Sequence, residues 1–439
     1  MSDTARAPFV QSLLDAAAAQ PLPGHGLGWL DAARRENLEA FAASGLPGAR
    51  DEAWKYTALR ALAQRRYALA DATAAEQAID MAALALPGVD GPALVFVNGV
   101  FRADLSSLAL MPRGLRLEPL SQALAGEAEP LRFALSRHYR ESGDAFARLN
   151  AGLAADGVVL QVAPRAKITT PVHLLFIGAP ASAQLAWHVR HVIELGAGAE
   201  LTLVEQHAAA GEQTHLGTQV ADLVVRDDAR LRHIVLQRAA TGSSLIRRSS
   251  YRLDAHAQAD LHLVELGGAL ARHDLQADLV GDGAQLTTHG VFMPSGRQHI
   301  DTQLAIRHQA LDTLSRSTWR GVADQRGRGV LRGAIKVAPG ADGSDASLSN
   351  KNLLLSAQAE IDTKPELEIY ADEVKAAHGA TVGQLDERAL FYLRSRGIPL
   401  ADARALLTAA FCRAVLEELP LEALREHLSN LLIAQLPST

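Results

Sequence analysis

The residue best suited to metal chemistry is His378, in the last quarter of the chain. It follows two alanines and precedes a glycine, so the local backbone is uncrowded and the imidazole is accessible. Neutral imidazole is a good ligand for iron and zinc. Asp372 and Glu373 are close in sequence and are candidates to orient the ring through hydrogen bonds. The structural alternative is a hydrogen-bonded turn histidine, and the residue types alone favour that alternative.

Sixteen histidines and one cysteine supply the other potential ligands and nucleophiles. The single Cys412 excludes disulfides and all-cysteine metal sites within the chain, and its place in a helical pattern favours a small buried residue over a nucleophile. His188 and His191 are three residues apart, so they face opposite sides of a strand and cannot bind one metal ion together. His256 and His262 share a strand face but are too far apart to converge. All four are interpreted as surface or ladder histidines.

No nucleotide-binding or hydrolase motif is present. The patterns G-x-x-x-x-G-K-[ST], G-x-S-x-G and H-E-x-x-H do not occur. Gly327, Gly329 and Gly333 lack the strand–loop–helix context of a phosphate-binding loop. Any ATP hydrolysis that the function requires is therefore expected in another chain.

Composition excludes further classes of function. The chain has 439 residues, 48% of them hydrophobic, which is enough for a large core, and its net charge is −6. That charge argues against a nucleic-acid binder and offers no polybasic contact for a membrane surface. The N-terminal segment does not have a signal-peptide pattern, and no stretch approaches eighteen uninterrupted apolar residues. A cytoplasmic location is the simplest expectation.

The first part of the chain has helical periodicity. Apolar residues recur at helical spacing from Trp29 to Ala43, and a Gly-Leu-Pro-Gly turn then ends the pattern. The apolar run Ala93–Val97 is stopped by Asn98-Gly99, which predicts a β-hairpin. A further helical stretch is expected from about Leu117 to Leu153.

From Gly157 the pattern changes to short alternating segments, and a weak repeat runs through them. The repeat is an Ala-polar-aliphatic triplet whose first residues are 33, 30, 30 and 25 positions apart: Ala166, Ala199, Ala229, Ala259 and Ala284. It returns at Ala359. Such a period is typical of stacked coils in a parallel β-helix. A β-sandwich is the main competitor, but two-residue hairpin turns are scarce.

Helical stripes resume after Asp386, with Pro420 between two of them. We therefore predict a mainly β protein with three domains. These are a mainly helical N-terminal domain (1–155) with a short hairpin near 93–102, a parallel β-helix core (156–383), and a C-terminal helical domain (384–439). Helices at both ends are expected to cap the solenoid and protect its unpaired strand edges.

Several segments resemble the SufB/SufD family of the SUF iron–sulfur cluster assembly machinery. The longest is EIYADEVKAAHGATVGQLDERALFYLRSRGIP, from Glu368 to Pro399. Shorter matches are DEAWKYT (51–57), VFVNGVF (95–101), WRG (319–321), RGAI (332–335) and NLLLSAQAEIDTKPELEIY (352–370). The resemblance covers nearly the full chain, and the C-terminal run is long enough to be specific.

The resemblance implies a right-handed parallel β-helix and a non-catalytic subunit of a heteromeric complex. In that family a SufD-type subunit pairs with a SufB-type scaffold subunit, and each binds a SufC-type ATPase through helices that follow the β-helix. Here the SufC contact corresponds to roughly Asp386–Leu419, with Leu390, Phe391, Tyr392 and Arg394 as candidate contact residues. The alternative is that the apolar members of this set only cap the solenoid.

His378 matches a family histidine implicated in cluster building at the SufB–SufD interface, so the resemblance makes it a candidate iron or cluster ligand. Many relatives have K-C-S-H here, whereas this chain has Lys375-Ala376-Ala377-His378. Because clusters are held mainly by cysteine thiolates, this chain is not expected to hold one alone. Near Lys351, where SufB relatives carry a cysteine, the residues are Ser349–Asn352, which favours the SufD branch.

Other functions stay open at this point. One is a self-sufficient cluster scaffold, and another is a free-standing β-helix enzyme that acts on polysaccharide, for which clustered carboxylates and an export signal are missing. A homodimer of the isolated chain through edge strands is a further expectation. The sequence does not address flavin binding, the iron donor or the target proteins.

Overall fold

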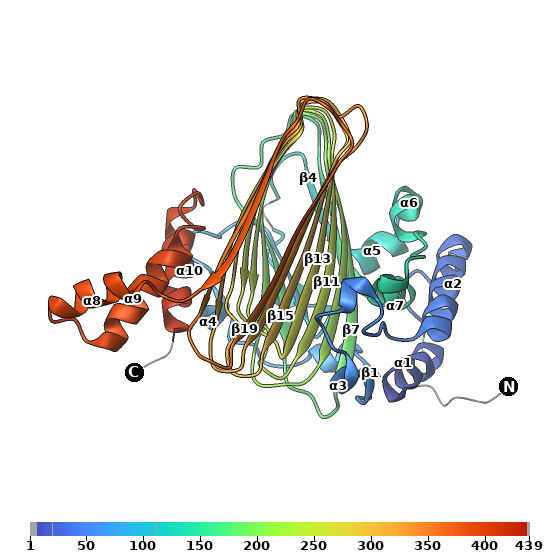
Figure 1. Cartoon of the computed structure of the whole chain (residues 1–439). Coiled ribbons are helices and arrows are strands. Elements are labelled where there is room, and N and C mark those ends of the chain that lie inside the picture. Colours follow the sequence, from blue (N-terminus) through green and yellow to red (C-terminus); the bar gives the residue numbers. More distant parts are fainter. Residues whose placement is uncertain (1–6, 20, 110, 437–439) are drawn as a thin grey trace.

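The computed structural model describes residues 7–19, 21–109 and 111–436. Its centre is a parallel β-solenoid, as predicted, in which odd-numbered strands form one sheet and even-numbered strands form the other (Figure 1). The solenoid strands are β5 (Asp156–Val162), β6 (Val172–Gly178), β7 (Leu185–Leu195), β8 (Glu200–Ala209), β9 (Leu216–Val225), β10 (Arg230–Gln237), β11 (Ser244–Leu253), β12 (Gln258–Glu265), β13 (Leu270–Leu279), β14 (Gln285–Phe292), β15 (His299–His308), β16 (Leu314–Ala323), β17 (Arg328–Val337), β18 (Asp345–Leu354), β19 (Glu360–Ile369) and β20 (Lys375–Gly383).

The flanking elements are mainly helical. The N-terminal ones are α1 (Pro8–Ala19), α2 (Gly28–Ser44), η1 (Glu52–Trp54), α3 (Arg60–Ala63), β1 (Ala68–Leu69), η2 (Ala72–Ala75), α4 (Met81–Leu84), β2 (Ala93–Val97), β3 (Val100–Phe101), η3 (Ala103–Leu105), β4 (Leu115–Pro119), α5 (Leu120–Ala125), η4 (Glu129–Leu131), α6 (Arg132–Leu135), η5 (Ser142–Asp144) and α7 (Ala145–Leu153). The C-terminal ones are α8 (Glu387–Ser395), α9 (Leu400–Arg413) and α10 (Glu422–Ala434). No helix in the described ranges is long and apolar enough to cross a membrane.

Stacking of like residues in successive coils holds the solenoid together. Leu201 pairs with Leu231, Leu231 with Ala259, and Ala259 with Leu286, all with side chains in the central core between the two sheets. Alternate residues of each strand face this core, so one row of aliphatic side chains per strand leaves water. The interior is mainly Leu, Val, Ile and Ala, which suits the low aromatic content of the chain.

The sequence repeat is real, but two of its members are misaligned. Leu231 pairs with Ala259 rather than with Leu261, so the repeat at this coil is Ala257-Gln258-Ala259. Ala359 precedes β19 in the other sheet, so it is not a continuation of the series, which runs along the even-numbered strands. Alanine is frequent enough to generate both false matches.

At the N-terminal end the chain extends both sheets before the coils begin. β2 pairs in parallel with β6, and β3 folds back on β2 across Asn98-Gly99, which confirms the predicted hairpin. β4 pairs antiparallel with β5, so the helix expected from Leu117 is wrong at its start. Leu115 and Leu117 alternate inward into the solenoid core, and this period of two favours a strand.

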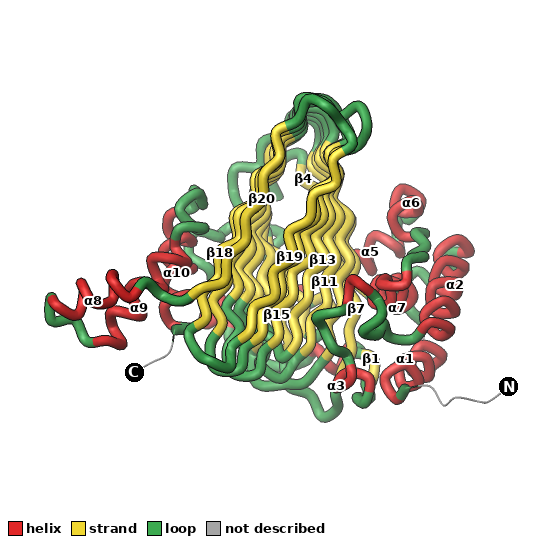
Figure 2. The backbone as a smooth tube through the Cα atoms, viewed as in Figure 1, coloured by secondary structure: helices red, strands yellow, loops and turns green. Residues whose placement is uncertain are grey.

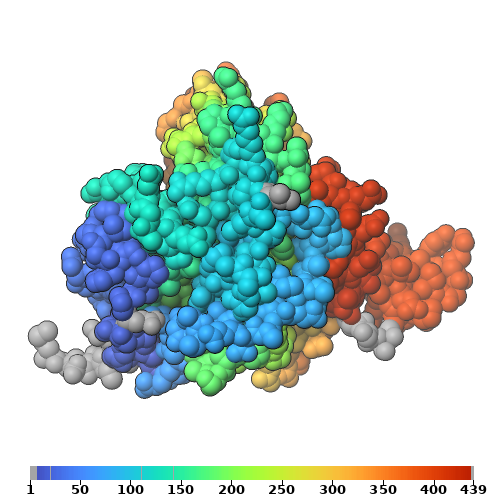
Figure 3. Space-filling model, turned by 180° about the vertical axis from the view of Figure 1, so that it is seen from behind, coloured from blue at the N-terminus to red at the C-terminus, as the bar shows by residue number. Residues whose placement is uncertain are grey.

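The helices lie against the outer faces of the sheets. α7 and α2 cover the odd-numbered sheet, where Leu149 and Leu153 pack near Ala186, Leu216 and Ile246. α9 and α10 cover the even-numbered sheet, and they pack against outward aliphatic residues of five strands: Val204, Ile234, Val264, Val291 and Val322. Viewed from behind, N-terminal segments cover the end of the solenoid where the coils begin (Figure 3).

The other end of the solenoid is not capped, contrary to expectation. β19 and β20 are the last strands of their sheets, and no described strand or helix lies over them (Figure 2). The C-terminal helices turn aside because the apolar stripe of α9 and α10 meets the apolar outer face of the even-numbered sheet. The three-domain division of the chain stays a prediction.

Candidate functional site at the open end of the solenoid

The open end consists of two unpaired strand edges. The Glu360 N–H donates to the carbonyl of Gly327, just before β17, and the Tyr370 N–H donates to that of Val337, the last residue of β17. The even-numbered residues of β19 therefore direct their main chain toward the solenoid. Odd-numbered residues, including Pro365, therefore direct theirs toward the free edge. A proline has no N–H to donate, and within sheets it is found at such edges. Ile369, Tyr370 and Val382 are exposed at this end.

His378 lies on β20, the last strand, and its partner in the register is Leu348 of β18. Leu348 belongs to the central core, so the imidazole occupies the row that faces the solenoid interior, at its mouth. The residue is exposed because no coil follows. It lies in a strand and takes part in no side-chain hydrogen bond within the described ranges, so the alternative of a hydrogen-bonded turn histidine is wrong.

The two acidic residues expected to orient His378 do not meet it. Asp372 and Glu373 lie in the turn before β20, and their backbone N–H groups donate to Asp342 at 3.2 Å. The strand from Lys375 to His378 alone spans about 10 Å. The imidazole therefore has no carboxylate partner from this turn.

The interior next to the mouth is lined by amides and a hydroxyl. Thr363 Oγ1 donates to Asn350 Oδ1 at 2.8 Å, and Asn352 Nδ2 donates to the Thr381 carbonyl at 2.9 Å. No group of three histidine, cysteine, aspartate or glutamate side chains in the described residues can hold a metal ion. His378 is thus a single good ligand at a mouth that lacks thiolates, and any metal site there requires ligands from a second chain.

The candidate partner-binding residues lie on α8, which stands away from the solenoid (Figure 1). None of its residues is buried; Phe391 is 74% exposed and Tyr392 57%. Leu390 is half-buried, Arg394 is exposed, and Arg396 stacks over the Tyr392 ring at 5.0 Å. The alternative that the apolar members only cap the solenoid is therefore wrong. Exposed aromatic side chains on a projecting helix are typical of a binding surface.

The four histidines interpreted as surface or ladder residues are mostly buried, and the ladder interpretation is confirmed for His262, which stacks on His289 of the next coil at 4.9 Å. His188 and His191 do face opposite sides of β7: His188 Nδ1 lies 2.7 Å from Thr218 Oγ1, and His191 stacks on Phe176 in the interior at 5.1 Å. Burial lowers the pKa of His188 to about 3 and that of His191 to about 4. His256 is in a turn with φ 54°, so it shares no strand face with His262, which is itself buried.

A buried acid–base network crosses the solenoid interior and was not predicted. Glu205 lies 2.7 Å from His207 and accepts from Gln219 of the opposite sheet at 2.9 Å. Burial opposes ionisation of Glu205, but its hydrogen bond with His207 and its contact with the His233 ring at 3.4 Å outweigh that effect and hold its pKa well below the usual value. A second ion pair joins Arg247 of one sheet to Glu265 of the other. The signal in the sequence that could have revealed this network is the presence of polar residues at inward-facing positions of strands with an alternating pattern.

Burial likewise opposes ionisation of Glu265, yet the nearby Arg247 charge lowers its pKa to about 2. Both glutamates are at most 2% exposed, and each links strands of different sheets. An ionised carboxylate without partners in such a place would be very costly. The network therefore fixes the two sheets against each other, and it lies apart from the open end.

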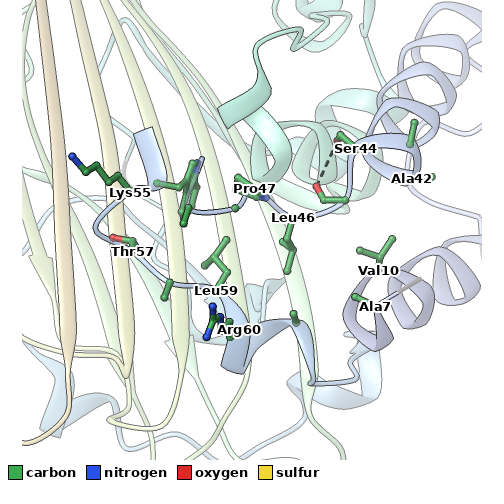
Figure 4. A pocket seen from close by; sticks show the side chains of 17 residues that line it. Ala7, Val10, Ala42, Ser44, Leu46, Pro47, Lys55, Thr57, Leu59 and Arg60 are labelled. Carbon is green, nitrogen blue, oxygen red and sulfur yellow. Dashed lines mark hydrogen bonds between the residues drawn. The ribbon is translucent and has the colours of Figure 1, made fainter. Parts of the chain in front are cut away.

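Two further features offer no chemistry. Cys412 is fully buried in α9, and burial raises the pKa of its thiol to about 12, so it is the small buried helix residue that was expected. A cavity of about 710 Å³ between α1, the end of α2 and η1 is lined mainly by apolar residues (Figure 4). The Thr57 hydroxyl at its wall is bonded to Asp301 and His299, which ties the N-terminal segment to the sheet.

Two family descriptions match successive parts of this chain. Residues 177–411 match the family described as "SUF system FeS cluster assembly, SufBD core domain", and residues 14–174 match "SufBD protein N-terminal region". The chain is 31% identical to the iron–sulfur cluster assembly protein SufD of Escherichia coli over 92% of both chains. It is 29% identical to a SufBD family protein of Synechocystis over 87% of this chain and 86% of that one. Identity to SufD of Bacillus subtilis is 27% over 65% of both chains.

Proposed function

We propose that this chain, which belongs to the SufBD family of the SUF iron–sulfur cluster assembly system, is a non-catalytic subunit of that machinery. In this proposal it pairs with a SufB-type scaffold subunit through the open end of its solenoid. It docks a SufC-type ATPase, which hydrolyses the ATP, through the helices that follow β20. It contributes His378 to cluster formation at the interface with the SufB-type subunit.

The observation that supports the pairing is the uncovered last coil. β19 and β20 end their sheets with exposed edges, and the row of His378 continues the core row of Leu348. A partner coil added to these strands would satisfy the free backbone groups and extend both sheets. It would also enclose the imidazole at the junction between the two proteins.

The cluster is cargo in this scheme, and the ligand set is divided between the chains. The described part of the open end offers one imidazole and no thiol, and the single cysteine lies buried in α9. Iron–sulfur clusters are held mainly by cysteine thiolates, with histidine as a substitute. The SufB-type partner is therefore the expected donor of the sulfur ligands, and this chain supplies a nitrogen ligand.

Docking of the ATPase is assigned to α8 because its aromatic side chains are exposed beside the solenoid rather than buried against it. Phe391, Tyr392 and Arg394 form a surface of the composition that concentrates binding energy in protein interfaces. Motion of an ATPase held there would be transmitted to the solenoid, because α8 follows β20, a strand of the open end, within four residues of the chain.

The decisive test is cluster maturation in cells that carry His378→Ala as the only copy of this subunit. Maturation is expected to fall about tenfold or more, as for loss of a metal-supporting residue, while the purified variant still pairs with both partners. Thr381→Ala is the matched control, because it changes an exposed outward residue of the same strand. Normal maturation with His378→Ala would refute the ligand role, and a wild-type chain that binds neither partner would refute the assembly role.

A further inference from the structure

The outward row of β19 is strongly acidic. Its residues are Glu360, Asp362, Lys364, Glu366 and Glu368, and they alternate with Ile361 and Leu367, which face the solenoid core. The matching row of β17 is basic. Arg328 pairs with Glu360 at 3.1 Å and with Asp362 at 2.7 Å, Arg332 pairs with Glu366 at 2.5 Å, and Lys336 pairs with Glu368 at 3.1 Å.

The β17 cations hold these carboxylates, and Glu366 is also paired with Lys364 of its own row at 2.9 Å. Lys364 pairs in addition with Glu52 of η1 at 2.7 Å. Within the described residues no cation holds the row from the free edge. The side chains of Glu360 and Glu368 are 56% and 57% exposed, and those of Asp362 and Glu366 are 26% and 29% exposed. An added strand would bring its outward side chains to about 5 Å from this row. If the outward row of that strand were basic, each carboxylate of β19 would lie between the cations of β17 on one side and those of the added strand on the other.

We infer that the free edge of β19 selects a partner strand whose outward row is basic, and that it disfavours a second copy of this chain. The inference rests on the pairing proposed above and names the chemistry of the strand that fits. The selectivity belongs to the odd-numbered sheet. On β20 the outward positions between Lys375 and Gly383 are Ala377, Gly379 and Thr381, which carry no charge.

Antiparallel pairing of β19 with itself shows the disfavoured case. When the two strands are centred on Lys364, Glu360 opposes Glu368, Asp362 opposes Glu366, and Lys364 opposes its own copy, so every opposed pair has like charges. When they are centred on Pro365, Asp362 opposes Glu368 while Lys364 opposes Glu366, and the attraction and repulsion offset each other. The registers with most overlap therefore give no net electrostatic gain. The missing N–H of Pro365 removes one edge donor as well.

The test is charge reversal at both ends of the row, in the double variant Glu360→Lys/Glu368→Lys of the full chain. Asp362 and Glu366 keep their partners in β17 in this variant. The matched control is Glu127→Lys/Glu426→Lys, which makes the same change of net charge at exposed positions away from the open end. Unchanged thermal unfolding of both variants would show that they fold.

Two quantities are measured: the Kd for the purified SufB-type subunit of the same organism, and self-association by sedimentation. The double variant is expected to bind that subunit about tenfold more weakly. It is expected to self-associate about tenfold more strongly in the register centred on Pro365, where the lysine introduced at position 368 opposes Asp362 and Lys364 opposes Glu366, although the register centred on Lys364 keeps like charges opposed. The control is expected to match wild type. Equal values for the double variant and wild type in both measurements would overturn the inference. A wild-type chain that does not bind the subunit at all would refute the proposed function instead, and self-association would still decide the role of the acidic row.

Discussion

Acidification from pH 7 to pH 5 should destabilise this protein steeply, because its solenoid buries neutral histidines. Burial lowers the pKa of His173, His191 and His308 to about 4 and that of His188 to about 3, from 6.5 in an unfolded chain. Each of these side chains is at most 8% exposed. The folded state therefore binds fewer protons than the unfolded state in this range. The stability that these groups contribute is present above pH 6.5 and is lost as the pH falls toward the folded pKa.

The magnitude follows from linkage. A histidine whose pKa drops from 6.5 to about 4 loses about 1.8 kcal/mol of folding free energy between pH 7 and pH 5, so four of them lose about 7 kcal/mol. That is a large fraction of the ~5–15 kcal/mol that stabilises typical domains. The buried carboxylates do not contribute in this window. The folded pKa of Glu265 is about 2 and that of Glu205 is well below 4.5, so the stability they contribute is lost only at lower pH.

The assay is urea unfolding at pH 8, 7, 6 and 5, followed by far-ultraviolet circular dichroism, on the wild type and His188→Asn. The asparagine keeps a hydrogen-bonding group near Thr218 but does not titrate, so the loss between pH 7 and pH 5 should shrink by about 1.8 kcal/mol. Between pH 8 and pH 7 both proteins should show nearly flat stability. A wild-type loss of less than about 2 kcal/mol from pH 7 to pH 5, or an unchanged slope in the variant, would refute the reasoning.

Two further predictions concern binding and the core. The double variant Phe391→Ala/Tyr392→Ala should weaken binding of the SufC-type ATPase, measured by calorimetric titration, by about 30-fold or more. Its thermal stability should not change, because both side chains are exposed. Phe133→Ala is the control, because Phe133 is a 95% exposed aromatic residue on α6. Arg247→Met should cost about 3–5 kcal/mol in urea unfolding, because it strands the buried Glu265 charge, and adding Glu265→Leu should recover most of that loss; equal stability of the single and double variants would contradict this.

The sequence predicted the parallel solenoid because its signal is local and repeated. Three patterns each depend on only a few neighbouring residues: the alternation within strands, the Ala-polar-aliphatic triplet and the hairpin at Asn98-Gly99. In addition, every coil needs side chains of similar size at its inward positions, so the pattern recurs along the chain. The register was harder to predict. Leu231 pairs with Ala259 and not with Leu261, and in an alanine-rich chain both alignments satisfy the same pattern.

Properties that depend on long-range packing could not be predicted in the same way. The strand at Leu115–Pro119 forms because β5 offers an edge, and its five residues carry too short a pattern to compete with the helical stretch around them. The capping role expected for the C-terminal helices failed because their partner surface, the outward aliphatic row of the even-numbered sheet, is known only once the strands are stacked. Burial of His188 and His191 depends on their partners in other strands and helices for the same reason.

The residues of the last coil indicate that the open end is an adapted feature of the chain. The inward row of β18 is Ala346, Leu348, Asn350 and Asn352, and the corresponding row of β20 is Ala376, His378, Ala380 and Val382. At the position of the core residue Leu348 the last strand has the polar ring of His378, and alanines lie on either side of it, which lowers the cost of exposing the middle of that row to water. Val382 is the one large aliphatic residue of the row, and it is exposed. β19 keeps its aliphatic inward residues, and it carries the edge proline and the acidic row. Each of the two terminal strands therefore has its own feature that limits unspecific strand pairing. A specific partner must be complementary to both strands.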